Sequence, residues 1–163
     1  MAEQLEAGTE FGEDTQKDRY LTFILENECY GIDIKYVTEI IGLQAITEIP
    51  ELPVYVKGII NLRGKIIPVI DVRLRFGKEA KAYNDRTCVI VVDMSNLSIG
   101  MIVDSVAEVL TIPEQDIVDP PQLNKETNSR YIRKIGKVGA AVKLLLDCER
   151  LLSENDLEAL SDV

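Results

Sequence analysis

The amino-acid sequence predicts a mostly β fold made of antiparallel barrels or sandwiches. Segments with the two-residue alternation of half-buried strands outnumber segments with helical spacing. The connections between these segments are too short for the repeated crossover helices that a parallel sheet needs. A length of 163 residues is enough for one ordinary domain or for two small packed subdomains.

The strands are predicted where apolar residues alternate or form a short continuous run between turn signals. They span residues 19–25, 30–34, 56–62, 65–71, 87–94, 97–103, 131–135 and 140–146. Arg63-Gly64 interrupts two apolar segments and is predicted as a hairpin turn, since glycine supplies the positive φ that a tight turn requires. The last hairpin is expected to turn near Gly136–Gly139.

Helices are predicted to be few and short. The spacing of Val37, Ile40 and Ile41 predicts an amphipathic helix over 35–41 that ends at Gly42. A helical turn is expected over Val72–Phe76, followed by a polar linker over 78–86. Ser153-x-x-Asp156 is an acceptable capping box and predicts a C-terminal helix.

The composition excludes several classes of function. A net charge of −10 argues against binding nucleic acid or an anionic membrane through bulk electrostatics. The chain has no histidine, which removes histidine-based triads and most zinc sites. The three cysteines are far apart and predict reduced thiols. Without a signal peptide or an apolar run of about 20 residues, the chain is expected to be soluble and cytoplasmic, with no membrane insertion.

Two segments of the chain resemble each other. Residues 31–40 and 100–109 carry Gly, Val, Glu and a final aliphatic residue in the same register. A second pair of segments, 66–74 and 142–152, ends a strand with Asp71 and Asp147 respectively. These matches indicate a tandem duplication of one strand-rich unit, as a hypothesis that gives weak support to two subdomains.

Carboxylates at strand ends are the main candidates for chemistry. Asp71, Asp93, Asp104 and Asp147 end or interrupt apolar strands, where carboxylates can bind a metal or act as acid and base. Capping of the following turns is the favoured interpretation. A metal-dependent enzyme that uses these carboxylates remains the alternative function. Binding of single-stranded nucleic acid by an OB-like barrel is disfavoured by the negative net charge and by the small number of aromatic residues. No cofactor and no catalytic residue are expected.

The segment PVYVKGIINLRGKIIPVIDVR, residues 53–73, closely resembles the signature of the CheW family of bacterial chemotaxis coupling proteins. Further matches carry the resemblance over roughly residues 18–160. They are Tyr30–Ile34 with Val37, Glu39 and Ile40, then Tyr83–Asp85, Val89–Val91, and Gly100 with Val103, Asp104 and Val106.

The resemblance implies two intertwined five-stranded barrels of SH3-like type, with short helices and a C-terminal helix. It implies a CheW-like domain of two subdomains over 18–163, while the acidic residues 1–17, with little apolar content, are predicted as a disordered tail. It also implies a non-enzymatic adaptor that binds the regulatory domain of the histidine kinase CheA and the cytoplasmic tip of methyl-accepting chemoreceptors. Such a protein would be cytoplasmic and recruited to membrane receptor arrays.

The resemblance also implies interface residues. The receptor groove is expected to involve Val37, Glu39, Gly58, Arg63 and Val106. Apolar contacts with the kinase are expected from Ile40, Leu43, Cys88 and Val109, any of which could instead belong to the core. Arg63 is the strongest candidate because a guanidinium can direct several hydrogen bonds at carbonyls or carboxylates of a partner. The alternative is that Arg63 is only an exposed turn residue.

Overall fold

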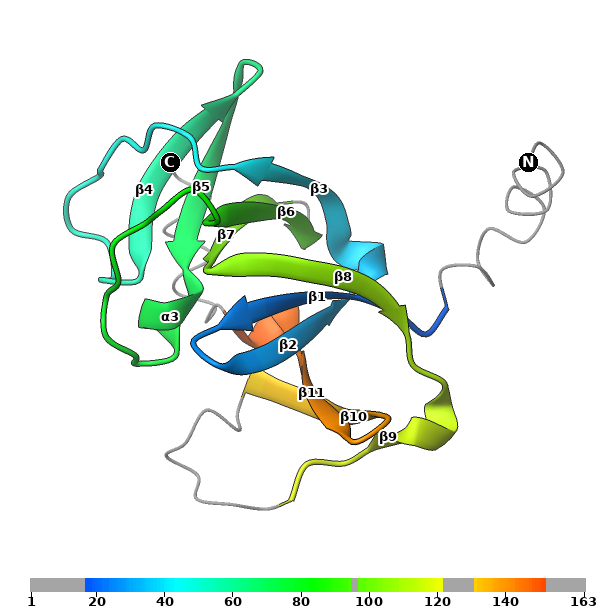
Figure 1. The fold of residues 1–163 in the computed structure, drawn as a ribbon. Helices are drawn as coiled ribbons and strands as arrows, with labels where there is room; N and C mark the ends of the chain where they lie inside the picture. Colours follow the sequence, from blue (N-terminus) through cyan, green and yellow to red (C-terminus); the bar gives the residue numbers. More distant parts are fainter. Residues whose placement is uncertain (1–16, 95–96, 122–130, 152–163) are drawn as a thin grey trace, which may run out of the picture.

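The computed structural model describes residues 17–94, 97–121 and 131–151, which form β-strands joined by short helical turns (Figure 1). The strands are β1 Arg19–Leu25, β2 Glu28–Asp33, β3 Val37–Gly42, β4 Val56–Leu62, β5 Lys65–Asp71, β6 Cys88–Met94, β7 Leu97–Val103, β8 Ser105–Thr111, β9 Ile117–Val118, β10 Ile132–Val138 and β11 Ala141–Leu146. The helical turns are η1 Ile34–Tyr36, α3 Val72–Arg75, η2 Glu114–Asp116 and η4 Cys148–Leu151. The prediction of a mostly β protein is therefore confirmed.

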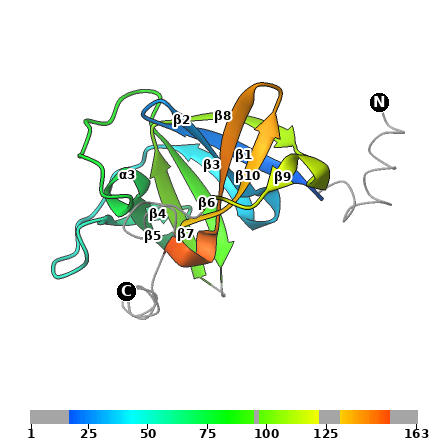
Figure 2. The same ribbon diagram turned by 90° about the horizontal axis from the view of Figure 1, so that it is seen from below.

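The strands form two sheets that exchange elements. The first sheet has the order β8-β1-β2-β11-β10-β9, and the second has the order β3-β6-β7-β5-β4. Strand β3 follows β2 in the chain but joins the second sheet, whereas β8 follows β7 and joins the first. The chain thus crosses twice between the sheets, as expected for two intertwined units. The β10–β11 hairpin and the tip of the β4–β5 hairpin lie far from each other (Figure 1 and Figure 2).

The two segments that resemble each other in sequence have equivalent strand pairing. In the first sheet, Gly31 of β2 lies opposite Leu145 of β11 in a parallel pair. In the second sheet, Gly100 of β7 lies opposite Val69 of β5, again in parallel. A Cβ at Gly31 would lie 2.9 Å from the Leu145 side chain, and one at Gly100 would lie 2.8 Å from that of Val69. In both repeats the glycine therefore leaves space for an aliphatic side chain of the neighbouring strand to pack against its backbone.

The ends of the repeated strands have matching hydrogen bonds as well. The amide of Asp71 donates to the carbonyl of Tyr55 at 2.8 Å, and the amide of Asp147 donates to the carbonyl of Tyr131 at 2.9 Å. The guanidinium of Arg75 lies over both tyrosine rings, 4.4 Å from the centroid of Tyr55 and 5.1 Å from that of Tyr131. Arg75 thus links the two units by contacting Tyr55 and Tyr131, which are equivalent residues of the two repeats.

The core has two parts because the second sheet is buried on both faces. On β6, Ile90 and Val92 belong to a large cluster that includes Phe23 and Leu25 of the first sheet. The alternate residues Val89 and Val91 belong to a smaller cluster with residues of β4, β5 and β7. Burial on both faces explains why this strand is a continuous apolar run and does not alternate.

The predicted helix over 35–41 is wrong. Only η1 is helical there, and residues Val37–Gly42 form strand β3, which pairs antiparallel with β6. The segment is rich in β-branched residues, which suit a strand, and β6 offers it an unpaired edge. Gly136 also lies within strand β10, so the last turn is confined to Gly139-Ala140. The predicted C-terminal helix and most of the predicted tail lie outside the described residues.

Candidate interaction site

Arg63 lies at the tip of the β4–β5 hairpin, and its side chain is 68% exposed. Arg63 has φ 53° and Gly64 has φ 90°. Positive φ at both central residues is the requirement of a type I′ turn, whose twist matches that of the flanking strands. The amide of Gly64 donates a 2.8 Å hydrogen bond to Oδ1 of Asn61. The predicted hairpin turn is confirmed, and it presents an arginine to solvent.

The guanidinium of Arg63 forms an ion pair with the carboxylate of Glu39 on β3. Strands β3 and β4 are opposite edges of the second sheet, so this contact brings the hairpin tip to the far edge of a curled sheet. Exposed ion pairs contribute roughly 0–1 kcal/mol to stability. The contact therefore orients both side chains more than it stabilises the fold, and it joins two of the predicted receptor residues.

The other predicted receptor residues are less accessible. Val37 and Val106 are half-buried and pack against the large core cluster. Gly58 is buried at a β-bulge of β4, and a Cβ there would lie 2.1 Å from the carbonyl oxygen of Thr47. Gly58 consequently has a structural role that is sufficient to explain its presence. Its contribution to receptor binding stays a prediction.

The predicted kinase residues divide into two groups. Ile40 and Val109 are 43% and 40% exposed on the edge strands β3 and β8, and they occupy equivalent positions of the two repeats. Leu43 and Cys88 are half-buried and pack against the core. Sequence reasoning did not single out Ile66 and Val142, which are 49% and 51% exposed. Ile66 and Val142 occupy equivalent positions of the two repeats, each five residues before the strand-end aspartates Asp71 and Asp147. This equivalence is the sequence feature that could have identified them.

Of the four strand-end aspartates, Asp71 and Asp147 act as caps, whereas Asp93 accepts from the Ser98 hydroxyl and Asp104 pairs with Arg73. Asp71 is buried, accepts a hydrogen bond from the amide of Leu74 and accepts a second, of 2.7 Å, from the Tyr83 hydroxyl. Burial, helped by this bond and by the Asp71 charge, raises the pKa of Tyr83. Asp147 accepts from the amide of Glu149 at 3.0 Å. Within residues 17–94, 97–121 and 131–151, no three Cys, Asp or Glu side chains gather as metal ligands would. The metal-enzyme alternative thus finds no support.

Two cavities, of about 370 and 230 Å³, lie among the described residues. Neither is lined by any of the predicted receptor or kinase residues. The receptor groove therefore stays a prediction, and its best-placed members are Arg63 and Glu39. In the described part of the chain, none of the helices combines the length and the apolar character needed to cross a bilayer.

Comparison with known proteins gives a consistent result. Residues 19–156 match the CheW-like domain family. The chemotaxis protein CheW of Klebsiella aerogenes is 35% identical over 150 residues, covering 92% of this chain and 90% of that protein. CheW of Treponema pallidum is 33% identical over 147 residues, covering 88% and 86%.

A solved structure agrees with these relatives. The crystal structure of the scaffolding protein TtCheW from Thermoanaerobacter tengcongensis is similar to this chain with a TM-score of 0.79 and 36% identity. The similarity covers 85% of this chain and 94% of that one. The chain therefore belongs to the CheW family, a family of chemotaxis scaffolding proteins and not of enzymes.

Proposed function

We propose that this protein is an adaptor that couples chemoreceptors to the histidine kinase CheA and has no chemistry of its own. Family membership and the duplicated fold support this function. The adaptor would control the kinase through contacts that differ between receptor states. It would work in the cytoplasm, recruited to receptor arrays at the membrane. The proposed domain spans residues 18–163, and the family match over 19–156 supports this division.

Receptor binding is proposed to centre on Arg63 and Glu39. The observation that carries this proposal is the exposed arginine at the tip of a tight hairpin, paired with the carboxylate of Glu39. A carboxylate or a helix-terminal carbonyl of the receptor tip could add to or replace the contact with Glu39, because a guanidinium has five donors. Little side-chain and backbone entropy would be lost on docking at such a tight turn.

Kinase binding is proposed to use the exposed aliphatic residues of the edge strands. Ile40 and Val109 lie on equivalent edges of the two sheets, so each unit offers a similar apolar contact. The regulatory domain of CheA is itself CheW-like and would meet such a surface with an equivalent one. The half-buried Leu43 and Cys88 would support these kinase contacts from below, whereas Val37, Gly58 and Val106 would support the receptor groove.

The experiment is a binding assay with a receptor cytoplasmic fragment and with CheA. Arg63→Glu should weaken receptor capture by about tenfold or more, because it removes charge-assisted hydrogen bonds and places two carboxylates together. Its melting temperature should stay within about 4 °C of wild type, since an exposed ion pair contributes at most about 1 kcal/mol. Lys137→Glu on β10 is a matched control, an exposed charge reversal on the other sheet.

The outcomes separate the proposals clearly. Failure of the wild-type protein to bind either partner would end the adaptor hypothesis. Unfolding of Arg63→Glu would instead show that Arg63 is structural. Equal loss of receptor capture in Lys137→Glu and Arg63→Glu would mean that net charge, and not the hairpin tip, controls the association.

A further inference from the structure

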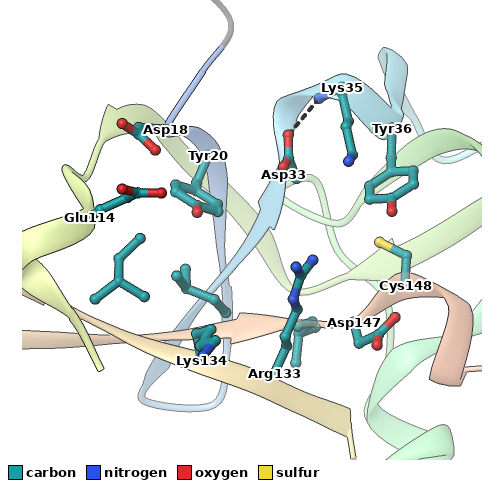
Figure 3. Close-up of a pocket in the computed structure, with 13 residues that line it drawn as sticks. Asp18, Tyr20, Asp33, Lys35, Tyr36, Glu114, Arg133, Lys134, Asp147 and Cys148 are labelled. Atoms are coloured by element: carbon teal, nitrogen blue, oxygen red, sulfur yellow. Dashed lines mark hydrogen bonds between the residues drawn. The ribbon is translucent and has the colours of Figure 1, made fainter. Parts of the chain in front are cut away.

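The larger cavity, of about 370 Å³, is a polar cleft at one end of the first sheet. Its side chains come from several elements, among them Tyr20 of β1, Asp33 at the end of β2, Glu114 of η2 and Arg133 of β10. Figure 3 shows the guanidinium of Arg133 in the middle of the cleft, with Tyr20 on one side and Tyr36 on the other. A cleft of this volume is large enough for a small ligand or a few residues of a polypeptide.

The second sheet provides an internal comparison for this cleft. Tyr20 and Asp33 are cross-strand partners in the β1–β2 pair. The equivalent partners in the β6–β7 pair are Val89 and Ile102, which are 0% and 2% exposed and belong to the smaller core cluster. The same fold is therefore stable with aliphatic side chains at these positions. The backbone arrangement alone therefore does not require polar residues here: Asp33 caps η1, and Tyr20 lies half-buried at the cleft.

Most charged side chains of the cleft already have partners. Asp33 accepts from the amide of Lys35, Lys35 lies over the Tyr36 ring, Asp147 accepts from the amide of Glu149, and Lys134 pairs with Asp119. Arg133, Asp18 and Glu114 are different, because none of their side chains has a hydrogen bond or an ion pair with any residue that the structure describes. The charged groups without a partner are thus the exposed Arg133 and Glu114 and the half-buried Asp18, while Asp33 keeps its negative charge beside Tyr20.

The three unpartnered groups lie on two sides of Tyr20 according to their charge, and Asp33 and Asp147 are also on the side of Arg133 (Figure 3). Asp18 and Glu114 lie together on one side of Tyr20, and Arg133 lies on the other (Figure 3). The pKa of Tyr20 is raised mainly by burial and further by Asp33, Asp18 and Glu114, while Arg133 lowers it. The phenol between the two charged sides is therefore neutral at pH 7, and its hydroxyl can donate a hydrogen bond.

We propose that this cleft binds a ligand with a carboxylate and an ammonium or guanidinium group a few atoms apart. The carboxylate contacts Arg133, with Tyr20 and Tyr36 as hydroxyl donors, and the cationic group lies against Asp18 and Glu114. Arginine suits this role because its planar donors match a carboxylate. Such a ligand is either a free small zwitterion or a neighbouring acidic and basic side chain on a polypeptide. The site is separate from the proposed receptor and kinase contacts.

The test is a titration of the ¹⁵N-labelled protein followed by two-dimensional NMR. The probes are 4-aminobutyrate, as the free zwitterion, and N-acetyl-Glu-Lys-amide, as the side-chain pair. N-acetyl-Glu-Glu-amide and N-acetyl-Lys-Lys-amide are the probes of a single sign. We expect saturable shifts of the amides around Tyr20, Ile117 and Arg133 with at least one mixed-charge probe below about 10 mM. Tighter binding of the dipeptide would indicate a polypeptide ligand, and tighter binding of 4-aminobutyrate a small molecule.

Variants of the cleft give the decisive comparison. Arg133→Gln and Glu114→Gln should each weaken binding of the better probe by about tenfold, since each removes one charge-assisted contact. Lys57→Gln is the matched control, because Lys57 occupies the position of Arg133 in the other repeat. Binding that is unchanged in both cleft variants would overturn the proposal. So would the absence of saturable shifts, or equal affinity for the probes of a single sign. CheA and receptor capture should be unchanged in Arg133→Gln.

Discussion

Replacing Gly58 by alanine would place a methyl group against the backbone of a neighbouring segment. The new Cβ would lie 2.1 Å from the carbonyl oxygen of Thr47 and 2.8 Å from its carbonyl carbon. That carbonyl cannot move freely, because it accepts a 2.9 Å hydrogen bond from the amide of Ile59, and the amide of Thr47 donates back to Ile59 at 2.9 Å. Gly58 also has φ 144°, a conformation that side chains with a Cβ rarely adopt.

The expected cost of Gly58→Ala is about 4 kcal/mol. A non-glycine residue at such a φ costs about 1–3 kcal/mol. Relief of the clash adds about 1–3 kcal/mol, as in an overpacked core, because the Thr47–Ile59 bridge has to shift. For a chain of this size each 1 kcal/mol lowers the melting temperature by about 2–4 °C. The variant should thus melt about 12 °C below wild type and still fold at low temperature.

Urea denaturation followed by circular dichroism measures this cost. Gly64→Ala is the matched control, since Gly64 has φ 90° in the neighbouring turn but open space at its Cβ position. It should lose only the conformational part, about 1 kcal/mol. If Gly58→Ala is no less stable than Gly64→Ala, the clash with Thr47 has no energetic weight. Receptor capture by folded Gly58→Ala at low temperature should match wild type if the glycine serves the fold alone.

Two further predictions concern buried polar contacts. Tyr83 has a pKa raised above its ordinary 10.0 by burial and by Asp71, so its contribution to stability is complete below pH 10 and is lost as pH rises further. The urea concentration at the unfolding midpoint should therefore decrease as the pH is raised above 10, and it should decrease less steeply in Tyr83→Phe. The same dependence of the midpoint on pH in both proteins would contradict this. Arg73 is buried between Glu26, at 2.8 Å, and Asp104, at 3.6 Å, so Arg73→Met should cost about 3 kcal/mol in urea denaturation. Glu26→Gln should cost less than about 1 kcal/mol, since Glu26 is half-exposed, and equal costs for the two variants would contradict the burial argument.

Part of the candidate site could be predicted from the sequence. The Arg63-Gly64 turn follows from local chemistry, because only a tight turn explains glycine between two apolar runs. The equivalence of Ile40 and Val109 followed from the register of the repeat, and both proved exposed. The burial of Gly58 could not be predicted in this way, since it depends on Thr47, whose bridge to Ile59 has no local signature. The pairing of Arg63 with Glu39 likewise depends on how the second sheet curls.

The sequence by itself determined most of the strands, the internal repeat and the family, but not β3, β8 or β9, because alternation, turn residues and motif order are local properties of the chain. The tertiary structure alone decided that Val37–Gly42 is a strand. The pattern of its apolar residues fits both a strand and an amphipathic helix, and pairing with the edge of a sheet selects the strand. It also decided that β3 and β8 change sheets. At equivalent positions the second sheet has a cluster of buried aliphatic side chains, whereas the first sheet has a charged cleft. These features depend on contacts between residues far apart in the chain, which no local pattern encodes.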